Sequence, residues 1–117
     1  VNVDGDPAKG GCPADQALDL VRAVRERSNL SVEGFMTIPA LATSANPDAA
    51  RAGFRRLRAL RDDARDRWPE VAHLSMGMSA DFEVAVEEGA TLVRLGTVVV
   101  GSRPRRAYGA ASGQEDG

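Results

Sequence analysis

The sequence has few cysteine, histidine and aromatic residues, and it has no long apolar run. One cysteine, Cys12, excludes an internal disulfide framework, and one histidine, His73, argues against a zinc site. The longest apolar run is far shorter than the ~18 residues that a membrane span needs, so no membrane partner is expected. The absence of GxGxxG and Walker motifs argues against a dinucleotide or nucleoside triphosphate fold.

Charge is nearly balanced, and its basic part is almost all arginine. The 117 residues carry a net charge of −2, which gives no reason to expect nucleic acid as a partner. Lys9 is the only lysine. Hydrophobic residues make up 43% of the chain, enough for one globular domain, and the low cysteine content fits a reducing, cytoplasmic setting. Because the sequence begins Val-Asn-Val, inside an expected strand, we expect that an N-terminal part is absent.

Apolar periodicity predicts alternating strands and helices. Asn46 is the expected N-cap of the longest helix, with Pro47 at its first position, Ser79 is the expected cap of the next helix, and Gly89 is expected just after that helix. The expected elements are a short extended segment at 1–3, helices at 15–27, 47–68 and 80–88, strands at 30–40, 71–77 and 91–96, and one helical turn at 97–101. Residues 1–104 then form one domain, and residues 105–117 are expected to be a disordered polar tail.

The order of these elements indicates the fold class. Strict alternation of strands and helices is typical of an α/β fold with parallel strands and crossover helices. Four such β/α units would make one half of a TIM-type (β/α)₈ barrel. An open α/β sheet is the structural alternative.

Candidate functional residues follow the carboxyl ends of the expected strands, where such barrels carry their sites. Ser79 and Gly96-Thr97 each combine a glycine-bearing turn, a hydroxyl and a helix start, which is typical of an anion pocket. Arg94 stands inside an apolar strand, where an arginine needs a partner. The simpler interpretations are that Ser79 only caps a helix, that Gly96-Thr97 is only a turn, and that Arg94 pairs with a carboxylate.

Three stretches resemble one protein family. "HLSMGMSADFEVAVEEGATLVRLGTVVVGSRP", "VEGFMTIPA" and "VNVDGDPAKGG" are similar to motifs of the pyridoxal phosphate homeostasis proteins, which are relatives of the alanine racemase barrel. The resemblance covers residues 1–104 and corresponds to the C-terminal half of that barrel. It implies a cytoplasmic protein that binds pyridoxal 5′-phosphate (PLP) and buffers or delivers it, with PLP-dependent apoenzymes as acceptors and without catalysis of its own.

The resemblance also assigns roles to single residues. It implies that Ser79, Gly96 and Thr97 hold the phosphate and that Arg94 faces the pyridine nitrogen. Met36 and Met76 would help to line the pocket, although apolar packing explains both methionines equally well.

The sequence also departs from the family pattern. The family's Schiff-base lysine lies on the first barrel strand, which has no counterpart here, and Lys9 matches a loop lysine instead. A fragment of a PLP-dependent amino-acid racemase is the alternative function. A third class is an interaction module that uses the arginine-rich helix 47–68, although arginines interleaved with aspartates are more typical of a solvated face.

Overall fold

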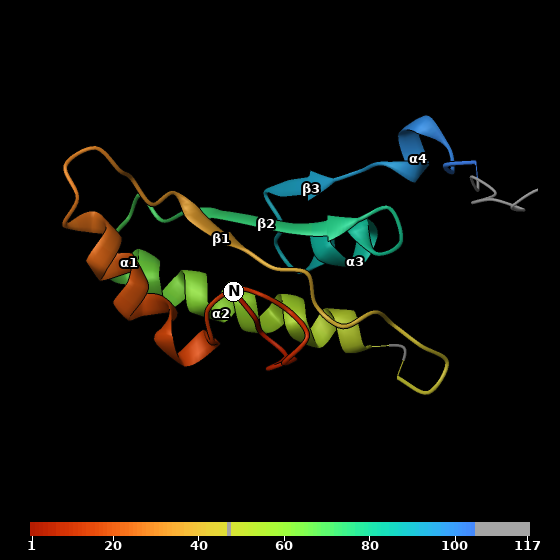
Figure 1. Ribbon diagram of the computed structural model, residues 1–117, viewed down its shortest axis with the longest axis horizontal. Coiled ribbons are helices and arrows are strands. Elements are labelled where there is room, and N and C mark those ends of the chain that lie inside the picture. Colours follow the sequence, from red (N-terminus) through yellow and green to blue (C-terminus); the bar gives the residue numbers. More distant parts are fainter. Residues whose placement is uncertain (47, 105–117) are drawn as a thin grey trace, which may run out of the picture.

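The computed structural model describes residues 1–46 and 48–104, so Pro47 and the expected tail at 105–117 lie outside it. Strands and helices alternate along the chain, as expected (Figure 1). A 3₁₀ turn at Ala14–Gln16 leads into α1 (Ala17–Arg25), followed by β1 (Gly34–Met36), α2 (Ala49–Arg67), β2 (His73–Met78), α3 (Phe82–Glu87), β3 (Leu92–Arg94) and α4 (Thr97–Val100). None of the helices in the described ranges is long and apolar enough to cross a bilayer.

The three strands form a parallel sheet in the order β1-β2-β3. This confirms the α/β class with parallel strands. The expected first strand at residues 1–3 is wrong in part, because the one bridge it forms within the described residues joins Asn2 to Pro13 in the following loop. The backbone of Val1 nevertheless lies beside β1, since its amine donates to the Met36 carbonyl and the Thr37 hydroxyl donates to the Val1 carbonyl. The chain then turns away from β1 at Asp4-Gly5, where Gly5 has a φ of +65°.

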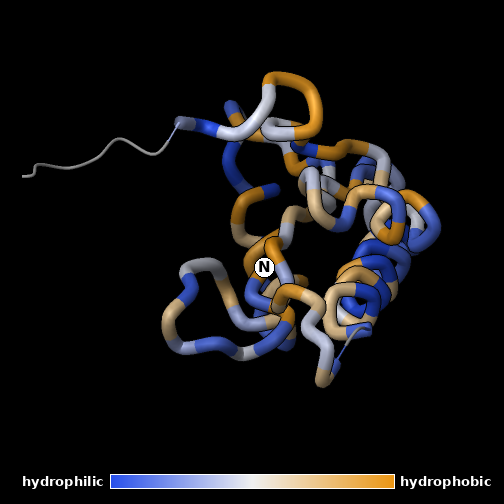
Figure 2. The backbone as a smooth tube through the Cα atoms, turned by 90° about the vertical axis from the view of Figure 1, so that its right-hand side faces the viewer, coloured by the Kyte–Doolittle hydropathy of each residue, from blue (hydrophilic) through white to orange (hydrophobic). Residues whose placement is uncertain are grey.

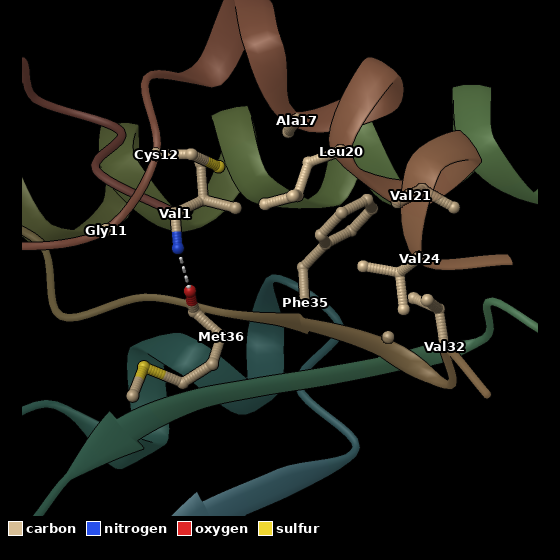
Figure 3. Close-up of a pocket in the computed structure, with 11 residues that line it drawn as sticks. Val1, Gly11, Cys12, Ala17, Leu20, Val21, Val24, Val32, Phe35 and Met36 are labelled. Carbon is tan, nitrogen blue, oxygen red and sulfur yellow. Dashed lines mark hydrogen bonds between the residues drawn. The ribbon is translucent and has the colours of Figure 1, made fainter. Parts of the chain in front are cut away.

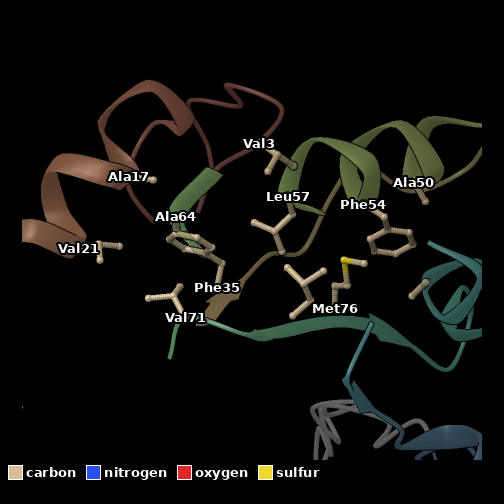
Figure 4. Close-up of a cluster of buried hydrophobic side chains, with 12 residues drawn as sticks. Val3, Ala17, Val21, Phe35, Ala50, Phe54, Leu57, Ala64, Val71 and Met76 are labelled. Carbon is tan, nitrogen blue, oxygen red and sulfur yellow. The ribbon is translucent and has the colours of Figure 1, made fainter. Parts of the chain in front are cut away.

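Helices α2 and α3 cover one face of the sheet, and the core lies between them (Figures 1 and 4). Phe54 and Leu57 of α2 are fully buried against Leu74 and Met76 of β2. The opposite face is open: Leu92 is 53% exposed and several neighbouring apolar side chains are also exposed. Parallel sheets are normally covered on both faces, whereas here helices cover only one.

The valines of α4 are exposed as well. Val98, Val99 and Val100 are 56%, 69% and 81% exposed. Figure 2 shows this segment as a hydrophobic turn of the backbone near the end of the described part of the chain. The predicted single helical turn is confirmed, and it presents an apolar surface rather than burying one.

Two of the expected helix caps are wrong, and one helix end is confirmed. α2 begins at Ala49 with Asp48 at the N-cap position, because Asn46 closes a tight turn through reciprocal backbone hydrogen bonds with Thr43. α3 begins at Phe82 after Asp81, so Ser79 is not its N-cap. Gly89 follows α3 with a φ of +100°, the conformation expected of a glycine at a helix C-terminus.

Arginines of α2 hold α3 through one buried carboxylate. Glu88, whose side chain is 5% exposed, accepts hydrogen bonds from Arg51 at 2.8 Å and Arg55 at 3.0 Å, and Arg58 lies 3.5 Å away. The hydrogen bond from Arg51 is the main cause that holds the pKa of Glu88 below its ordinary value. Arg55 and Arg58 remain 62% and 41% exposed, so this part of α2 is a solvated arginine face that also binds one carboxylate.

Candidate functional site

Gly77 gives the carboxyl end of β2 its shape. Its φ is +101°, and a Cβ at this position would lie 2.6 Å from the Cβ of Ala85 and 3.2 Å from the Cα of Phe82. Helix α3 therefore packs directly on the backbone of β2. The pairing with β3 is irregular between Ser75 and Met78, so the strand bends where it approaches Ser79.

Ser79 joins the two strand ends that the sequence analysis singled out. Its Oγ accepts hydrogen bonds from the backbone N–H groups of Gly96 and Val98, both at 3.2 Å. Gly96 is the residue before α4, and Thr97 is the first residue of α4. Ser79, Gly96 and Thr97 thus lie together, with a hydroxyl and backbone N–H groups converging on one point.

The Arg94 side chain extends across the sheet and contacts a backbone carbonyl instead of a carboxylate. One of its terminal nitrogens donates to the carbonyl of Thr37 at 2.9 Å, which bridges from β3 past β2 to the end of β1. Its Nε is buried and has no hydrogen-bond partner. Within residues 1–46 and 48–104, no carboxylate lies within ion-pair distance of Arg94. The guanidinium therefore keeps a donor that is removed from water and still unused.

The two methionines lie on opposite faces of the sheet. Met36 is 47% exposed and lines a hollow of about 340 Å³ at the end of β1, together with Lys9, Thr37 and Ile38. Met76 is fully buried on the helix-covered face, close to Phe54 (Figure 4). The packing interpretation therefore describes Met76, and its role in lining a PLP pocket stays a prediction.

Lys9 belongs to a small polar network at the same edge. Its Nζ donates to the Ile38 carbonyl at 3.0 Å and lies 3.7 Å from a carboxylate oxygen of Asp4. Asp4 also accepts the N–H of Ala40 and lies 3.4 Å from Arg56. This network fixes the loop after residues 1–3 against the loop after β1.

Sequence reasoning missed two residues of this region. Thr37 is 1% exposed and supports Arg94 through its carbonyl, while its hydroxyl holds Val1. A backbone carbonyl leaves no signal in the sequence, so Thr37 could not have been found this way. Asp4 follows the Val-Asn-Val segment directly, and a carboxylate at a strand end was a signal that could have been used. Within the described ranges, no group of three potential metal ligands is present.

Comparison with known proteins shows which family this chain belongs to. Residues 1–104 match the model of the alanine racemase N-terminal domain. The chain belongs to this family. Among curated members, the pyridoxal phosphate homeostasis protein of Aquifex aeolicus is 47% identical over 104 residues, and that of Pseudomonas aeruginosa is 43% identical over 110 residues. These matches cover 88% and 94% of this chain but only 45% and 44% of the relatives, so the chain spans less than half of their length.

Solved structures of other proteins share the fold of this chain. A protein of Bifidobacterium adolescentis has a TM-score of 0.77 and 33% identity, covering 85% of this chain and 40% of that one. PipY of Synechococcus elongatus, solved without PLP, has a TM-score of 0.72 and 30% identity, covering 83% and 45%. PipY with PLP bound has a TM-score of 0.63 and 32% identity over the same shares. The resemblance to the pyridoxal phosphate homeostasis proteins is thus confirmed.

Proposed function

We propose that this chain supplies the phosphate side and the ring-nitrogen side of a PLP site in a protein of intracellular PLP homeostasis. The observation that carries the proposal is the contact of Ser79 Oγ with the N–H groups of Gly96 and Val98. The Ser79 hydroxyl and these backbone N–H groups are donors that suit a phosphate, because charge-assisted hydrogen bonds to an anion are stronger than neutral ones. The names of the curated relatives and the PLP-bound PipY structure support the choice of ligand.

The residues present also suit the ring of PLP. When bound, PLP supplies an aldehyde that reacts with amines and a pyridine ring that withdraws electrons. The buried Nε of Arg94 is a free donor next to the strand ends. A guanidinium keeps its protons, so Arg94 would donate to the pyridine nitrogen and disfavour its protonation. Ser79 and Thr97 would donate their hydroxyls to the phosphate, and Met36 would border the ring from the open face.

We further propose that the sheet is the C-terminal half of a TIM-type (β/α)₈ barrel, comprising residues 1–104. Support comes from the parallel strands in chain order, with helices on one face only, and from the open apolar face on the other. In such a barrel the open face would be the interior, and Ser79, Arg94 and Gly96 would lie at the mouth that carries active sites.

A carrier is favoured over an enzyme. Lys9, the only lysine, donates to a backbone carbonyl in the loop after residues 1–3 and is not at the end of one of the three strands. An arginine beside the ring nitrogen also weakens the ring as an electron sink, which suits storage and delivery of PLP to apoenzymes in the cytoplasm. The racemase alternative is retained because the matching family model is that of the alanine racemase N-terminal domain.

Binding of PLP and of pyridoxal, which lacks the phosphate, tests the proposal. In Ser79→Ala and in Thr97→Val, one hydroxyl donor to the phosphate is lost. Hydrogen bonds to charged groups contribute about 1.5–3 kcal/mol, so each change should weaken PLP about tenfold or more. Pyridoxal should be affected much less. Titrations followed by phosphorus NMR for PLP and by absorbance for both ligands measure the two affinities.

A matched control is Ser44→Ala, since Ser44 is exposed in the loop before α2. It should leave both affinities unchanged. An equal loss of PLP and pyridoxal in Ser79→Ala would mean that this residue supports the fold rather than the phosphate, and the proposed function would fail.

A further inference from the structure

Asp81 closes the turn between β2 and α3 from both sides. Its backbone N–H donates to the carbonyl of Met78 at 3.1 Å, and its side-chain Oδ1 accepts the N–H of Met78 at 2.8 Å. Ser79 and Ala80 are the two residues that these hydrogen bonds enclose. Figure 1 shows the chain reversing here, between the tip of β2 and the start of α3. Because Met78 is the last residue of β2, Asp81 ties the enclosed residues to the end of a strand.

The Asp81 side chain does not make the contact that is usual for its position. Asp81 directly precedes the first residue of α3, where an aspartate normally accepts an N–H from the first turn of its own helix. Within residues 48–104, the Asp81 side chain makes no such bond with α3, and its carboxylate points back along the chain to Met78. The start of the helix therefore does not explain the direction of this side chain. That direction supports the turn that carries Ser79.

The position of the Ser79 oxygen depends on the backbone of this turn. A serine oxygen has three staggered positions relative to its backbone, so the turn decides which neighbours Oγ can reach. Here Oγ accepts the N–H groups of Gly96 and Val98 at 3.2 Å each, which is the long end of the range for such bonds. A small displacement of the turn would therefore break at least one of the two contacts.

We propose that Asp81 is a positioning residue that holds Ser79 Oγ where it can meet a phosphate, an inference that rests on the proposed function. The carboxylate does so against its own charge, because a negative group two residues from Ser79 repels an anion. Substitution separates the two effects. An asparagine keeps an oxygen acceptor for the Met78 N–H and carries no charge, whereas an alanine removes the acceptor and the charge together.

Titrations with PLP and with pyridoxal, together with hydrogen exchange in the absence of ligand, test this role. Asp81→Ala should weaken PLP about fivefold or more and pyridoxal less than about twofold, because only PLP uses the Ser79 hydroxyl as a donor to a charged group. Asp81→Asn should bind PLP at least as tightly as the unchanged chain. Hydrogen exchange at the Gly96 and Val98 N–H groups should be about threefold faster or more in Asp81→Ala, because their contacts with Ser79 open more often, and unchanged in Asp81→Asn. Should Asp81→Ala not fold, Asp81→Glu gives the same comparison, since it keeps the charge and displaces the acceptor.

Two control variants match the loss of charge and the loss of stability. Asp48→Ala removes a carboxylate from the N-cap position of α2, where the side chain likewise makes no cap bond, and it should leave both affinities unchanged. Val21→Ala removes buried apolar contacts beside Phe35 in the hollow between β1 and α1 (Figure 3), and it should lower the midpoint of urea unfolding. Figure 1 shows α1 at the other end of the molecule from α3, so the ratio of the PLP and pyridoxal affinities should stay the same in Val21→Ala.

Three results would overturn the positioning role of Asp81. Equal weakening of PLP in Asp81→Ala and Asp81→Asn would show that the charge matters and the acceptor does not. Equal loss of PLP and pyridoxal in Asp81→Ala would show a general structural role, and unchanged exchange at Gly96 and Val98 would show that Asp81 does not hold Ser79. The exchange measurement needs no ligand, so it tests Asp81 even if Ser79→Ala shows that the proposed function fails.

Discussion

Gly77→Ala should destabilise the chain because two separate effects act at one atom. The added Cβ would lie 2.6 Å from the Cβ of Ala85, and something must then shift. Overpacking of this kind costs about 1–3 kcal/mol. The φ of +101° adds about 1–3 kcal/mol for a residue with a side chain. The free energy of unfolding should therefore fall by about 2–6 kcal/mol, a large part of the stability of a domain of this size.

Urea unfolding followed by circular dichroism measures this loss as a lower midpoint at an unchanged slope. Gly10→Ala is the matched control, because no heavy atom lies within 4 Å of its added Cβ and its φ is not in the left-handed region. The double variant Gly77→Ala with Ala85→Gly removes the shortest contact and should recover only the packing part. If Gly77→Ala and Gly10→Ala unfold at the same urea concentration, the close packing of α3 on β2 is not what requires a glycine here.

Four further changes probe the core, the charge cluster, the site and the open face. Phe54→Ala, at a fully buried side chain, should cost about 3–5 kcal/mol in urea unfolding, and a cost below 1 kcal/mol would contradict the packing described. The folded pKa of Glu88 lies below its ordinary 4.5, so the stability that its carboxylate contributes is present above that pH and is lost as pH falls through the folded pKa. Glu88→Gln should therefore be less stable at neutral pH, and its free energy of unfolding should fall less on acidification. Parallel stability–pH curves for the two proteins would refute this. Arg94→Glu should raise the protonation of the PLP ring nitrogen, as seen by nitrogen NMR of labelled PLP, and identical titration in both proteins would show that Arg94 does not face it. Leu92→Ser should reduce concentration-dependent light scattering without lowering the urea midpoint, and unchanged scattering would mean that the open face does not drive association.

The alternation of elements was predictable, but their lengths were not. Periodicity indicated a strand at residues 30–40, whereas only Gly34–Met36 pair with β2. A local pattern shows where a chain is apolar and extended, but a strand also needs a neighbour in register. The same limit explains the segment at 1–3, which has strand-like residues and forms only one bridge.

The site was predictable in its composition and less so in its detail. Ser79 and Asp81 are both good N-cap residues two positions apart, and local sequence alone does not decide between them. Met36 and Met76 differ in the face they occupy, and a parallel strand that is apolar on both faces carries no periodic signal of orientation. Their separation became visible only with the positions of the helices.

The link between α2 and α3 was a second signal, besides Asp4, that sequence reasoning left unused. Arg51, Arg55 and Arg58 lie at positions i, i+4 and i+7, so they share one face of a helix. Three arginines on one face point to a shared carboxylate, and the acidic pair Glu87-Glu88 ends the next expected helix. The structure joins these groups over more than thirty residues of sequence.

The contacts of Glu88 hold α3 at the end of the helix that is remote from Ser79. Arginines hold the C-terminal end of the helix, while its N-terminal end leads back to Ser79. Six helical residues span about 9 Å, so a tilt of about 10° around the fixed end would displace the other end by about 1.6 Å. That displacement is enough to break the 3.2 Å contacts between Ser79 Oγ and the N–H groups of Gly96 and Val98. A rotation of α3 by this amount would thus separate Ser79 Oγ from the two backbone N–H groups that it accepts from.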